Sequence, residues 1–241
     1  MLSVEQFLDL RQTHHASLFD ALSHPWEALS RLNAYILDYL EHQPARESSY
    51  QGAYVGEQVA IGKDVVIEPG AMIQGPAVIG DRCQIRHNAT LRANVIVGDG
   101  CVVGSACELK QCLLFNEVAV SHMNYVGDSI LGFQAHLGAG AKLSNYKWNG
   151  DSVVIRSDHD PKCSIQTGLN KFGAIVGNQV EVGCNAVICP GSLIGPRSVI
   201  YPNTLWRGVL PEDRVVKHLT TQQIVDKRIP GQVEPGGRAS T

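Results

Sequence analysis

The chain has 241 residues, enough for one domain with additional elements. Charged residues make up 18% of it, glycine accounts for 24 positions and the net charge is −3, a balance that suits short strands joined by tight turns and lacks the basic stripe typical of nucleic-acid binding. It contains no run of about 18 apolar residues, and residues 1–15 carry acidic side chains without an apolar stretch, so we expect neither a membrane span nor a signal peptide.

Residues 1–48 have the pattern of a helical segment. Apolar residues recur there mostly at three- and four-residue steps. The sequence Ser23-His24-Pro25 interrupts this pattern, and Pro25 suits the first turn of a helix that runs to about Glu41. We expect this segment to cap the open end of the following repeat and to bury its first coil, with residues 43–52 as the linker.

From Val55 onward, an apolar residue falls on every sixth position. The positions are Val55, Ile61, Ile67, Ile73, Ile79, Ile85, Leu91, Val97, Val103, Leu109 and Phe115, and the period resumes as Val176, Val182, Ile188, Ile194, Ile200 and Trp206. A fixed short period is the mark of a solenoid. Six residues make one short strand and one turn, and stacking such units buries a continuous aliphatic ladder.

Small residues two places before the periodic positions are expected to point inward as well. Cys83, Cys101 and Cys107 share this place with several alanines, so we interpret them as core thiols of a reduced, cytoplasmic protein rather than as disulfides or metal ligands. Known hexapeptide proteins place three repeats in each coil of a triangular prism. That geometry predicts about five coils before residue 146 and about two after residue 173.

The period becomes irregular once. Ser121 is polar where an aliphatic residue is expected, and Val126 and Leu131 follow at steps of five before Leu137 restores the six-residue step. A repeat protein that departs from its own rule often does so at a functional site. Residues 147–173 leave the period entirely and are expected to form a loop or a small ribbon.

The last part of the chain differs from the repeat. Residues 211–227 begin with proline and two acidic residues, which predicts a closing helix. Residues 229–241 are rich in Gly and Pro and are expected to be disordered.

Two cations lie close to the irregular region. Arg92 and Lys110 are 18 residues apart, so a three-sided prism stacks one above the other, with Glu108 as the one obvious carboxylate nearby. Two adjacent cations suit a bound anion, and phosphate fits Arg and Lys. A solvated charged face is the alternative interpretation.

His122 directly follows the irregular position, two hexads after Lys110. A lone histidine is more often structural than catalytic, but a neutral imidazole at this place could remove a proton from an amine or hydroxyl nucleophile. Further polar residues follow at spacings that could line the same groove, or could be ordinary turn and surface residues. They are Tyr125, His136, Asn145 and Tyr146.

Several motifs between residues 92 and 195 agree in order and spacing with one family. LRAN (91–94), ELK (108–110), SHMNYVGDSILG (121–132), LGAG (137–140) and SNY (144–146) resemble the left-handed β-helix acetyltransferase domain of the bacterial bifunctional glucosamine-1-phosphate acetyltransferase/uridylyltransferase. Residues 167–195 are similar to the archaeal-type sugar-phosphate nucleotidyltransferase/acetyltransferases, which also carry an insertion after the Asn-Tyr pair. The match covers roughly residues 55–210.

The resemblance implies roles for individual residues. His122 would be the general base, Glu108 would orient or polarise the cluster, and Asn145 would position the amine or the thioester. The sugar phosphate would be held by Arg92 and Lys110, and the amino-sugar pocket would be lined by Tyr125, His136, Asn145 and Tyr146. Acetyl-CoA would contact Cys184, Pro202 and Lys217. His136 stands where the bacterial enzymes usually have Asn.

The resemblance also implies a homotrimer with each site between neighbouring prisms. The bifunctional relatives begin with a nucleotidyltransferase domain and its Gly-rich loop, which residues 1–48 do not resemble, so we expect no uridylyltransferase activity.

The sequence therefore predicts an all-β, left-handed parallel β-helix of hexapeptide repeats over residues 53–210, preceded by a helical segment (1–48) and followed by a C-terminal helix and tail (211–241). The predicted activity is transfer of acetyl from acetyl-CoA to an amino-sugar phosphate, most simply glucosamine 1-phosphate for UDP-N-acetylglucosamine synthesis, without a catalytic metal. Three alternatives remain. They are an acyltransferase for a nucleotide-linked amino sugar, a non-catalytic scaffold or sugar-nucleotide binding module, and a zinc hydratase, for which only His122 and His136 are plausible neighbouring ligands.

Overall fold

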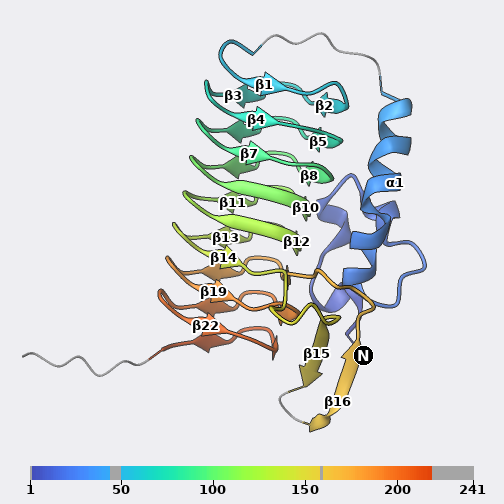
Figure 1. Ribbon diagram of the computed structural model, residues 1–241, viewed down its shortest axis with the longest axis vertical. Helices are drawn as coiled ribbons and strands as arrows, with labels where there is room; N and C mark the ends of the chain where they lie inside the picture. The colour runs from blue at the N-terminus through green and yellow to red at the C-terminus, as the bar shows by residue number, and fades with distance from the viewer. Residues whose placement is uncertain (1, 44–49, 158–159, 219–241) are drawn as a thin grey trace, which may run out of the picture.

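The computed structural model describes residues 2–43, 50–157 and 160–218. They form a three-sided parallel β-helix, with a segment containing helix α1 (Ala28–Glu41) lying along one of its sides (Figure 1). No helix within the described ranges is long and apolar enough to cross a membrane.

Each side of the prism carries eight of the described strands, and successive coils pair in parallel. Face 1 consists of β1 (Tyr54–Val55), β4 (Met72–Ile73), β7 (Thr90–Leu91), the first parts of β10 (Glu108–Leu114) and β12 (Tyr125–Leu131), β14 (Lys142–Leu143), β19 (Val187–Ile188) and β22 (Leu205–Trp206). Face 2 consists of β2 (Val59–Ile61), β5 (Ala77–Ile79), β8 (Val95–Val97), the last parts of β10 and β12, β17 (Ala174–Val176), β20 (Ser192–Ile194) and β23 (Val209–Leu210). Face 3 consists of β3 (Val66–Ile67), β6 (Gln84–Ile85), β9 (Val102–Val103), β11 (Ala119–Val120), β13 (His136–Leu137), β18 (Glu181–Val182), β21 (Val199–Ile200) and β24 (Val215–Val216).

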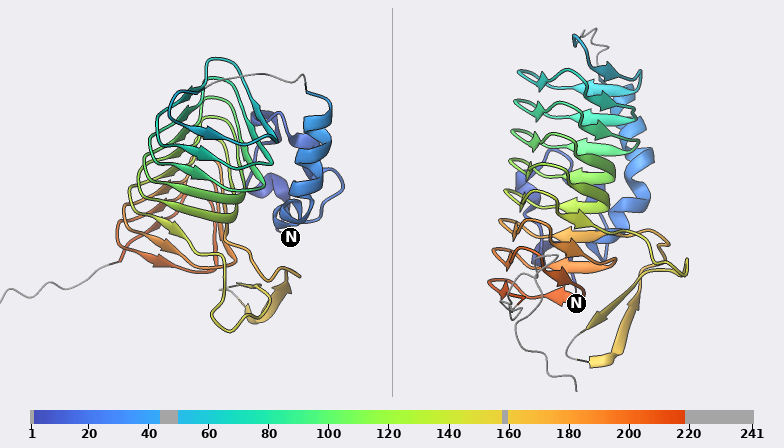
Figure 2. Two further views of the ribbon diagram at one scale, coloured as in Figure 1. Left: turned by 45° about the horizontal axis from the view of Figure 1, so that its top comes forward. Right: turned by 60° about the vertical axis from the view of Figure 1, so that its left-hand side comes forward.

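The chain passes from face 1 to face 2, then to face 3 and back to face 1. We call the corner after face 1 the 1/2 edge and the corner after face 3 the 3/1 edge. The tilted view in Figure 2 shows how the coils stack so that each edge forms a continuous row along the prism. Residues at equivalent places in successive coils therefore become neighbours in space, whatever their separation in sequence.

The periodic residues fill the interior as predicted. Ile73, Ile85, Leu91 and Val103 are fully buried within one continuous apolar cluster. Cys83, Cys101 and Cys107 are buried free thiols in the same cluster, and burial strongly raises the pKa of the Cys101 thiol. Burying one aliphatic side chain contributes about 1.5–3 kcal/mol, so the ladder is the main source of the fold's stability.

The irregularity of the period differs from the prediction. Leu109 pairs with Leu91, 18 residues earlier, but Leu114 pairs with Val97, 17 residues earlier. The inward position is therefore taken by Leu114 and not by Phe115, whose ring packs outside the prism against Phe19.

Ser121 consequently does not occupy a core position. Val120, one residue earlier, is the inward side chain of that coil. The shortening occurs at the 1/2 edge, where β10 and β12 run through the corner and Gln111 and Asp128 adopt left-handed φ angles of 49° and 47°. The coils lose a residue at that corner and not at Ser121, so the interpretation of Ser121 as a failed core position is wrong.

The N-terminal segment does not cap the end of the prism. Four 3-10 turns, η1 (Val4–Gln6), η2 (Leu10–Gln12), η3 (Ala16–Phe19) and η4 (Pro25–Glu27), precede α1, which ends at Glu41 as predicted. The segment covers face 2, because the outward residues of that face are apolar and need a partner. These residues are Val78, Ile96, Leu113, Ile130, Ile175 and Leu193.

The excursion at 147–173 contains a small ribbon, as expected. Strands β15 (Val154–Ser157) and β16 (Asp160–Gln166) pair antiparallel and diverge from the prism at the 1/2 edge (Figure 2). The predicted closing helix is wrong where it can be checked, because Val215–Val216 form strand β24, which extends face 3 by pairing with β21. Residues 219–227 of that predicted helix and the tail at 229–241 lie outside the described residues.

Candidate active site

Arg92 and Lys110 both lie at the 1/2 edge, and the backbone N–H of Arg92 donates to the carbonyl of Leu109 at 2.8 Å. Each cation has its own carboxylate. Arg92 Nη1 lies 2.9 Å from Glu108 Oε1, and Lys110 Nζ lies 3.1 Å from Asp128 Oδ2. The expectation of two cations without separate counter-charges is therefore wrong, and the corner carries both signs of charge.

Asp128 is the residue that sequence reasoning missed. Its carboxylate is almost fully buried and accepts hydrogen bonds from Lys110 and from Asn145 Nδ2. Gly127-Asp128 has the composition of an ordinary turn, which concealed this role. Asp128 follows Lys110 by 18 residues, the same spacing that separates Lys110 from Arg92. This spacing could have identified Asp128 from the sequence.

Tyr125 completes this network. Its hydroxyl accepts a hydrogen bond from Asn145 Nδ2 at 3.2 Å. Burial raises the pKa of Tyr125, so the phenol stays protonated and can donate to a ligand. A Cβ at Gly127 would lie 2.6 Å from both the Asn145 amide nitrogen and the Tyr125 hydroxyl, so glycine leaves the room that this pair occupies.

Tyr146 lies next to this network at the base of the 147–173 ribbon. It forms an isolated bridge with Lys171, whose Nζ is 6.0 Å from the centre of the Tyr146 ring. Tyr146 is half exposed, and the neighbouring Trp148 is 95% exposed. Two aromatic side chains, one and three residues after Asn145, are thus exposed at the surface.

His122 lies at the 3/1 edge, and its backbone is firmly held. Its carbonyl accepts from Gly140 N–H at 2.8 Å, while Met123 N–H donates to the carbonyl of Ser105 at 2.9 Å. Among the described residues, no hydrogen bond or ion pair engages the exposed imidazole. Glu108, expected to orient or polarise the cluster, pairs with Arg92.

His136 is placed on face 3 and not in a groove with Asn145. Its Nε2 lies 2.9 Å from Ser121 Oγ, and its Nδ1 lies 2.7 Å from Glu181 Oε2. Within the part of the chain that the structure describes, no three His, Cys, Asp or Glu side chains converge as metal ligands.

The residues expected to contact acetyl-CoA lie along the same edge as His122. Val120, Leu137, Val182 and Ile200 are successive partners on face 3. The residues two places after them are therefore stacked at the 3/1 edge, and these are His122, Ala139, Cys184 and Pro202. Cys184 is exposed, and Lys217 follows on the next coil with its Nζ 4.9 Å from the Tyr201 ring.

Apart from His136 on face 3, the predicted site residues form two groups at opposite edges of face 1. One group is the 1/2-edge network around Asp128, and the other is the 3/1-edge row that begins at His122. One chain does not bring the two groups together.

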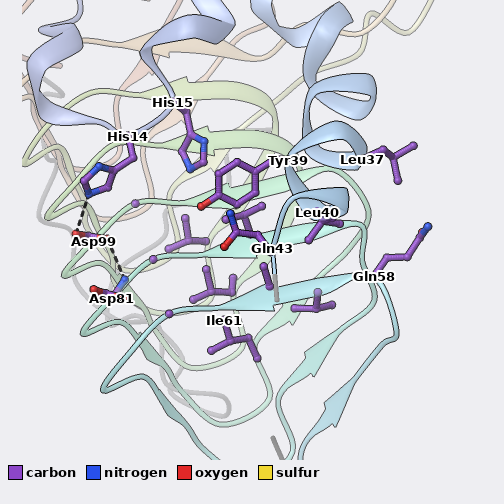
Figure 3. A pocket seen from close by; sticks show the side chains of 18 of the residues that line it. His14, His15, Leu37, Tyr39, Leu40, Gln43, Gln58, Ile61, Asp81 and Asp99 are labelled. Carbon is purple, nitrogen blue, oxygen red and sulfur yellow. Dashed lines mark hydrogen bonds and ion pairs between the residues drawn. The ribbon is translucent and has the colours of Figure 1, made fainter. Parts of the chain in front are cut away.

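Two cavities of the described structure lie elsewhere. Figure 3 shows the first, of about 800 Å³, between α1 and the first coils, lined by His14, Tyr39, Ile61 and Asp81 among others. The second, of about 820 Å³, lies between the first turns and strand β23. Neither is lined by a predicted site residue.

Comparison with known proteins identifies the type of domain. The family model of the GMPPB C-terminal domain matches residues 73–167. The uncharacterized acetyltransferase YaiX of Escherichia coli O6:K15:H31 is 36% identical over 154 residues, which cover 64% of this chain and 66% of YaiX. The bifunctional protein GlmU of Methanococcus maripaludis strain S2 is 32% identical over 190 residues, which cover 76% of this chain and 43% of GlmU. The repeat domain is a GlmU-type acetyltransferase domain.

A solved structure supports the fold of this GlmU-type domain. LpxA of Bacteroides fragilis, a UDP-N-acetylglucosamine acyltransferase, superposes with a TM-score of 0.50 at 16% identity, covering 64% of this chain and 58% of that one. This likeness confirms the predicted left-handed parallel β-helix and concerns the fold alone. The chain spans less than half the length of the curated GlmU relative.

Proposed function

We propose that this chain is an acetyl-CoA-dependent N-acetyltransferase that acts on an amino-sugar phosphate, with glucosamine 1-phosphate as the preferred acceptor in UDP-N-acetylglucosamine synthesis. The observation that carries the proposal is the mixed-charge network at the 1/2 edge, where Arg92 and Lys110 lie beside Glu108, Asp128 and Asn145. It is supported by the sequence similarity to GlmU-type acetyltransferase domains.

The two signs of charge suit a zwitterionic acceptor better than a simple phosphate. An amino-sugar phosphate carries an ammonium group, hydroxyls and a phosphate. Carboxylates accept hydrogen bonds from ammonium and hydroxyl groups, whereas guanidinium and ammonium groups bind phosphate. Arg92 has one donor engaged with Glu108 and its side chain is 46% exposed, so it retains further N–H groups for a phosphate.

In the proposed reaction, His122 removes a proton from the acceptor amine while the nitrogen attacks the thioester carbon. The tetrahedral intermediate collapses to the amide, and the CoA thiolate leaves and is protonated. Asn145 has its amide nitrogen committed to Asp128 and Tyr125, so it is better placed to hold the sugar than the oxyanion. We assign the oxyanion to a backbone N–H.

The separation of the two groups supports a homotrimer, as in the family resemblance. If neighbouring prisms pack edge to edge, the 1/2-edge network of one chain meets His122 of the next, and each site becomes complete. Acetyl-CoA would then lie along the 3/1 edge, past Cys184 and Pro202 toward Lys217.

The proposal is tested by measuring CoA release from acetyl-CoA in the presence of glucosamine 1-phosphate. His122→Ala should lower the rate about 10²–10⁴-fold, because the general base is lost. His87→Ala is the matched control, since His87 lies at the same edge but pairs with Glu68. Equal activity of wild type and His122→Ala would rule out His122 as the general base.

One observation favours a second acceptor class. The exposed rings of Tyr146 and Trp148, one and three residues after Asn145, could stack on a nucleobase, as a nucleotide-linked amino sugar would require. Higher kcat/KM with a nucleotide-linked amino sugar, lost in Trp148→Ala, would favour this alternative over glucosamine 1-phosphate.

A further inference from the structure

Three polar side chains on neighbouring coils of face 3 form a linear chain of contacts. Ser121 follows β11, His136 lies in β13 and Glu181 lies in β18, and these strands are consecutive partners. Ser121 Oγ lies 2.9 Å from His136 Nε2, and Glu181 Oε2 lies 2.7 Å from His136 Nδ1. The hydroxyl and the carboxylate therefore contact opposite nitrogens of one imidazole.

The carboxylate determines the direction of these hydrogen bonds. An ionised Glu181 can only accept, so Nδ1 of His136 carries the proton and donates. In the neutral ring Nε2 is then an acceptor, and the Ser121 hydroxyl donates to it. This order of hydroxyl, imidazole and carboxylate is the arrangement that activates a serine as a nucleophile.

The backbone of Ser121 is held in place around this contact. Its N–H donates to the carbonyl of Leu137 at 3.0 Å. Its carbonyl occupies the space beside Gly104, where any Cβ would overlap it. The side chains of His136 and Glu181 are 40% and 56% exposed, and Ser121 is partly exposed, so the three side chains lie at the surface of the prism.

A second set of serine, histidine and glutamate lies close together in this chain but lacks the hydroxyl–imidazole–carboxylate order. Ser105, His87 and Glu68 have the same side-chain types at the same 3/1 edge, but Ser105 Oγ and Glu68 Oε2 both contact Nδ1 of His87, at 3.2 and 3.1 Å. No proton can pass from that hydroxyl across the ring toward the carboxylate. Ser105 is thus a matched control for Ser121.

We propose that Ser121, His136 and Glu181 form a second, nucleophilic centre that takes an acyl group from an activated ester or thioester. Ser121 Oγ bonds to the acyl carbon as His136 Nε2 accepts the hydroxyl proton. The carbon–leaving-group bond breaks, and the leaving group takes that proton from His136. Water then attacks the acyl-serine with His136 as base, which releases the carboxylic acid and restores the hydroxyl.

The test uses the full chain with p-nitrophenyl acetate, which does not depend on CoA binding or on an amino-sugar acceptor. Wild type should release p-nitrophenol and acquire one acetyl group on the peptide containing Ser121, measured by mass spectrometry after a rapid acid quench. Ser121→Ala should abolish the adduct, and Glu181→Gln should slow it about tenfold or more, because the glutamine amide can donate to Nδ1 and so favours the tautomer with the proton on Nε2. The double variant Ser121→Ala/Glu181→Gln should be no slower than Ser121→Ala alone.

Ser105→Ala should retain the wild-type rate and adduct. An adduct that persists in Ser121→Ala, maps to Cys184, or forms equally fast in Glu181→Gln would overturn the proposal. Circular dichroism and the melting temperature of each variant separate loss of the hydroxyl–imidazole–carboxylate order from loss of the fold. His122→Ala should retain the adduct, so failure of the proposed acetyltransferase function and failure of this centre give different results.

Discussion

Asp128 joins Lys110 and Asn145 at the 1/2 edge, and Asn145 extends this network to Tyr125. Lys110 and Asn145 both donate to its buried carboxylate, whereas Glu108 and Arg92 form a pair that is nearly half exposed. The two ion pairs have similar lengths but different surroundings. Their contributions to stability should therefore differ, because solvent screens the exposed pair and not the buried one.

Asp128→Ala should lower the free energy of unfolding by about 3–5 kcal/mol, because it leaves Lys110 and the Asn145 amide without their buried acceptor. Glu108→Ala is the matched comparison and should cost about 0–1 kcal/mol, since its ion pair is solvent-exposed. Urea unfolding at one fixed protein concentration measures both changes. Similar costs for the two variants would contradict the described difference in burial.

Gly104 allows the turn that carries Ser121 and His122 to approach the preceding coil. A Cβ at this position would overlap the Ser121 carbonyl oxygen, so Gly104→Ala should shift that turn and lower both the melting temperature and acetyl transfer. The control is Gly100→Ala, whose Cβ would lie 3.6 Å from Glu117 Cγ, an ordinary contact, so that its cost of about 1–2 kcal/mol comes from its φ of 66°. Unchanged activity in Gly104→Ala would show that the position of this turn does not matter for transfer.

Among the elements, the repeat strands and helix α1 could be predicted because local pattern determines them. The six-residue period and the alternation of inward residues follow directly from the sequence. The place where a coil loses one residue could not be assigned, because Phe115 and Leu114 are both apolar and either satisfies the pattern. Only pairing with Val97 in the adjacent coil distinguishes them.

The position of the N-terminal segment illustrates a similar limit. The apolar stripe of α1, with Leu29, Leu32 and Ile36 buried, shows that one side needs a partner but does not identify it. That partner is the outward surface of face 2, where Ile96 and Ile130 repeat in register across coils. Such a surface becomes visible only when the coils are stacked.

His15 makes the attachment of this segment sensitive to acid. It lies buried against Tyr35 and Tyr39 of α1, with Tyr35 Oη 3.1 Å from its Nδ1. Burial lowers the pKa of His15 to about 4, with the charge of His14 acting in the same direction and that of Asp99 opposing it. The folded chain therefore holds the neutral imidazole.

The contribution of His15 to the free energy of unfolding is fully present above pH 6.5, where its imidazole is neutral in the folded and the unfolded chain. Between pH 6.5 and 4 the unfolded chain alone binds the proton, so the free energy of unfolding should fall by about 3 kcal/mol in total over that range. Urea unfolding at several pH values measures this loss. His15→Asn should show a smaller loss between pH 7 and 4 than wild type, and an equal loss would exclude His15 as its source.

At the scale of the whole molecule, the candidate site is divided between two edges of one prism. Sequence motifs identified members of both groups as candidate site residues, among them His122, Lys110 and Asn145. Their separation across face 1 could not be predicted from spacing alone, because the number of residues between them does not show which edge each one occupies. Completion of the site by a neighbouring chain is a proposal that can be tested directly.

Mixing two inactive variants tests whether one site uses residues of two chains. His122→Ala and Lys110→Met should each show little transfer, but a sample refolded from equal amounts of both should recover about a quarter of the wild-type activity, because a quarter of the interfaces pair two intact edges. No recovery after mixing would place both residues in a site within one chain. Sedimentation of the mixture confirms that mixed oligomers have formed.

The measurement that tests the proposed function most directly is acceptor-dependent release of CoA by the wild-type chain. Acetyl-CoA is incubated with and without glucosamine 1-phosphate, the free thiol is titrated, and the sugar product is identified by mass spectrometry. We predict that the acceptor increases thiol release and that this increase equals the amount of N-acetylglucosamine 1-phosphate formed. No increase with the acceptor, or no N-acetylated product, would contradict the account.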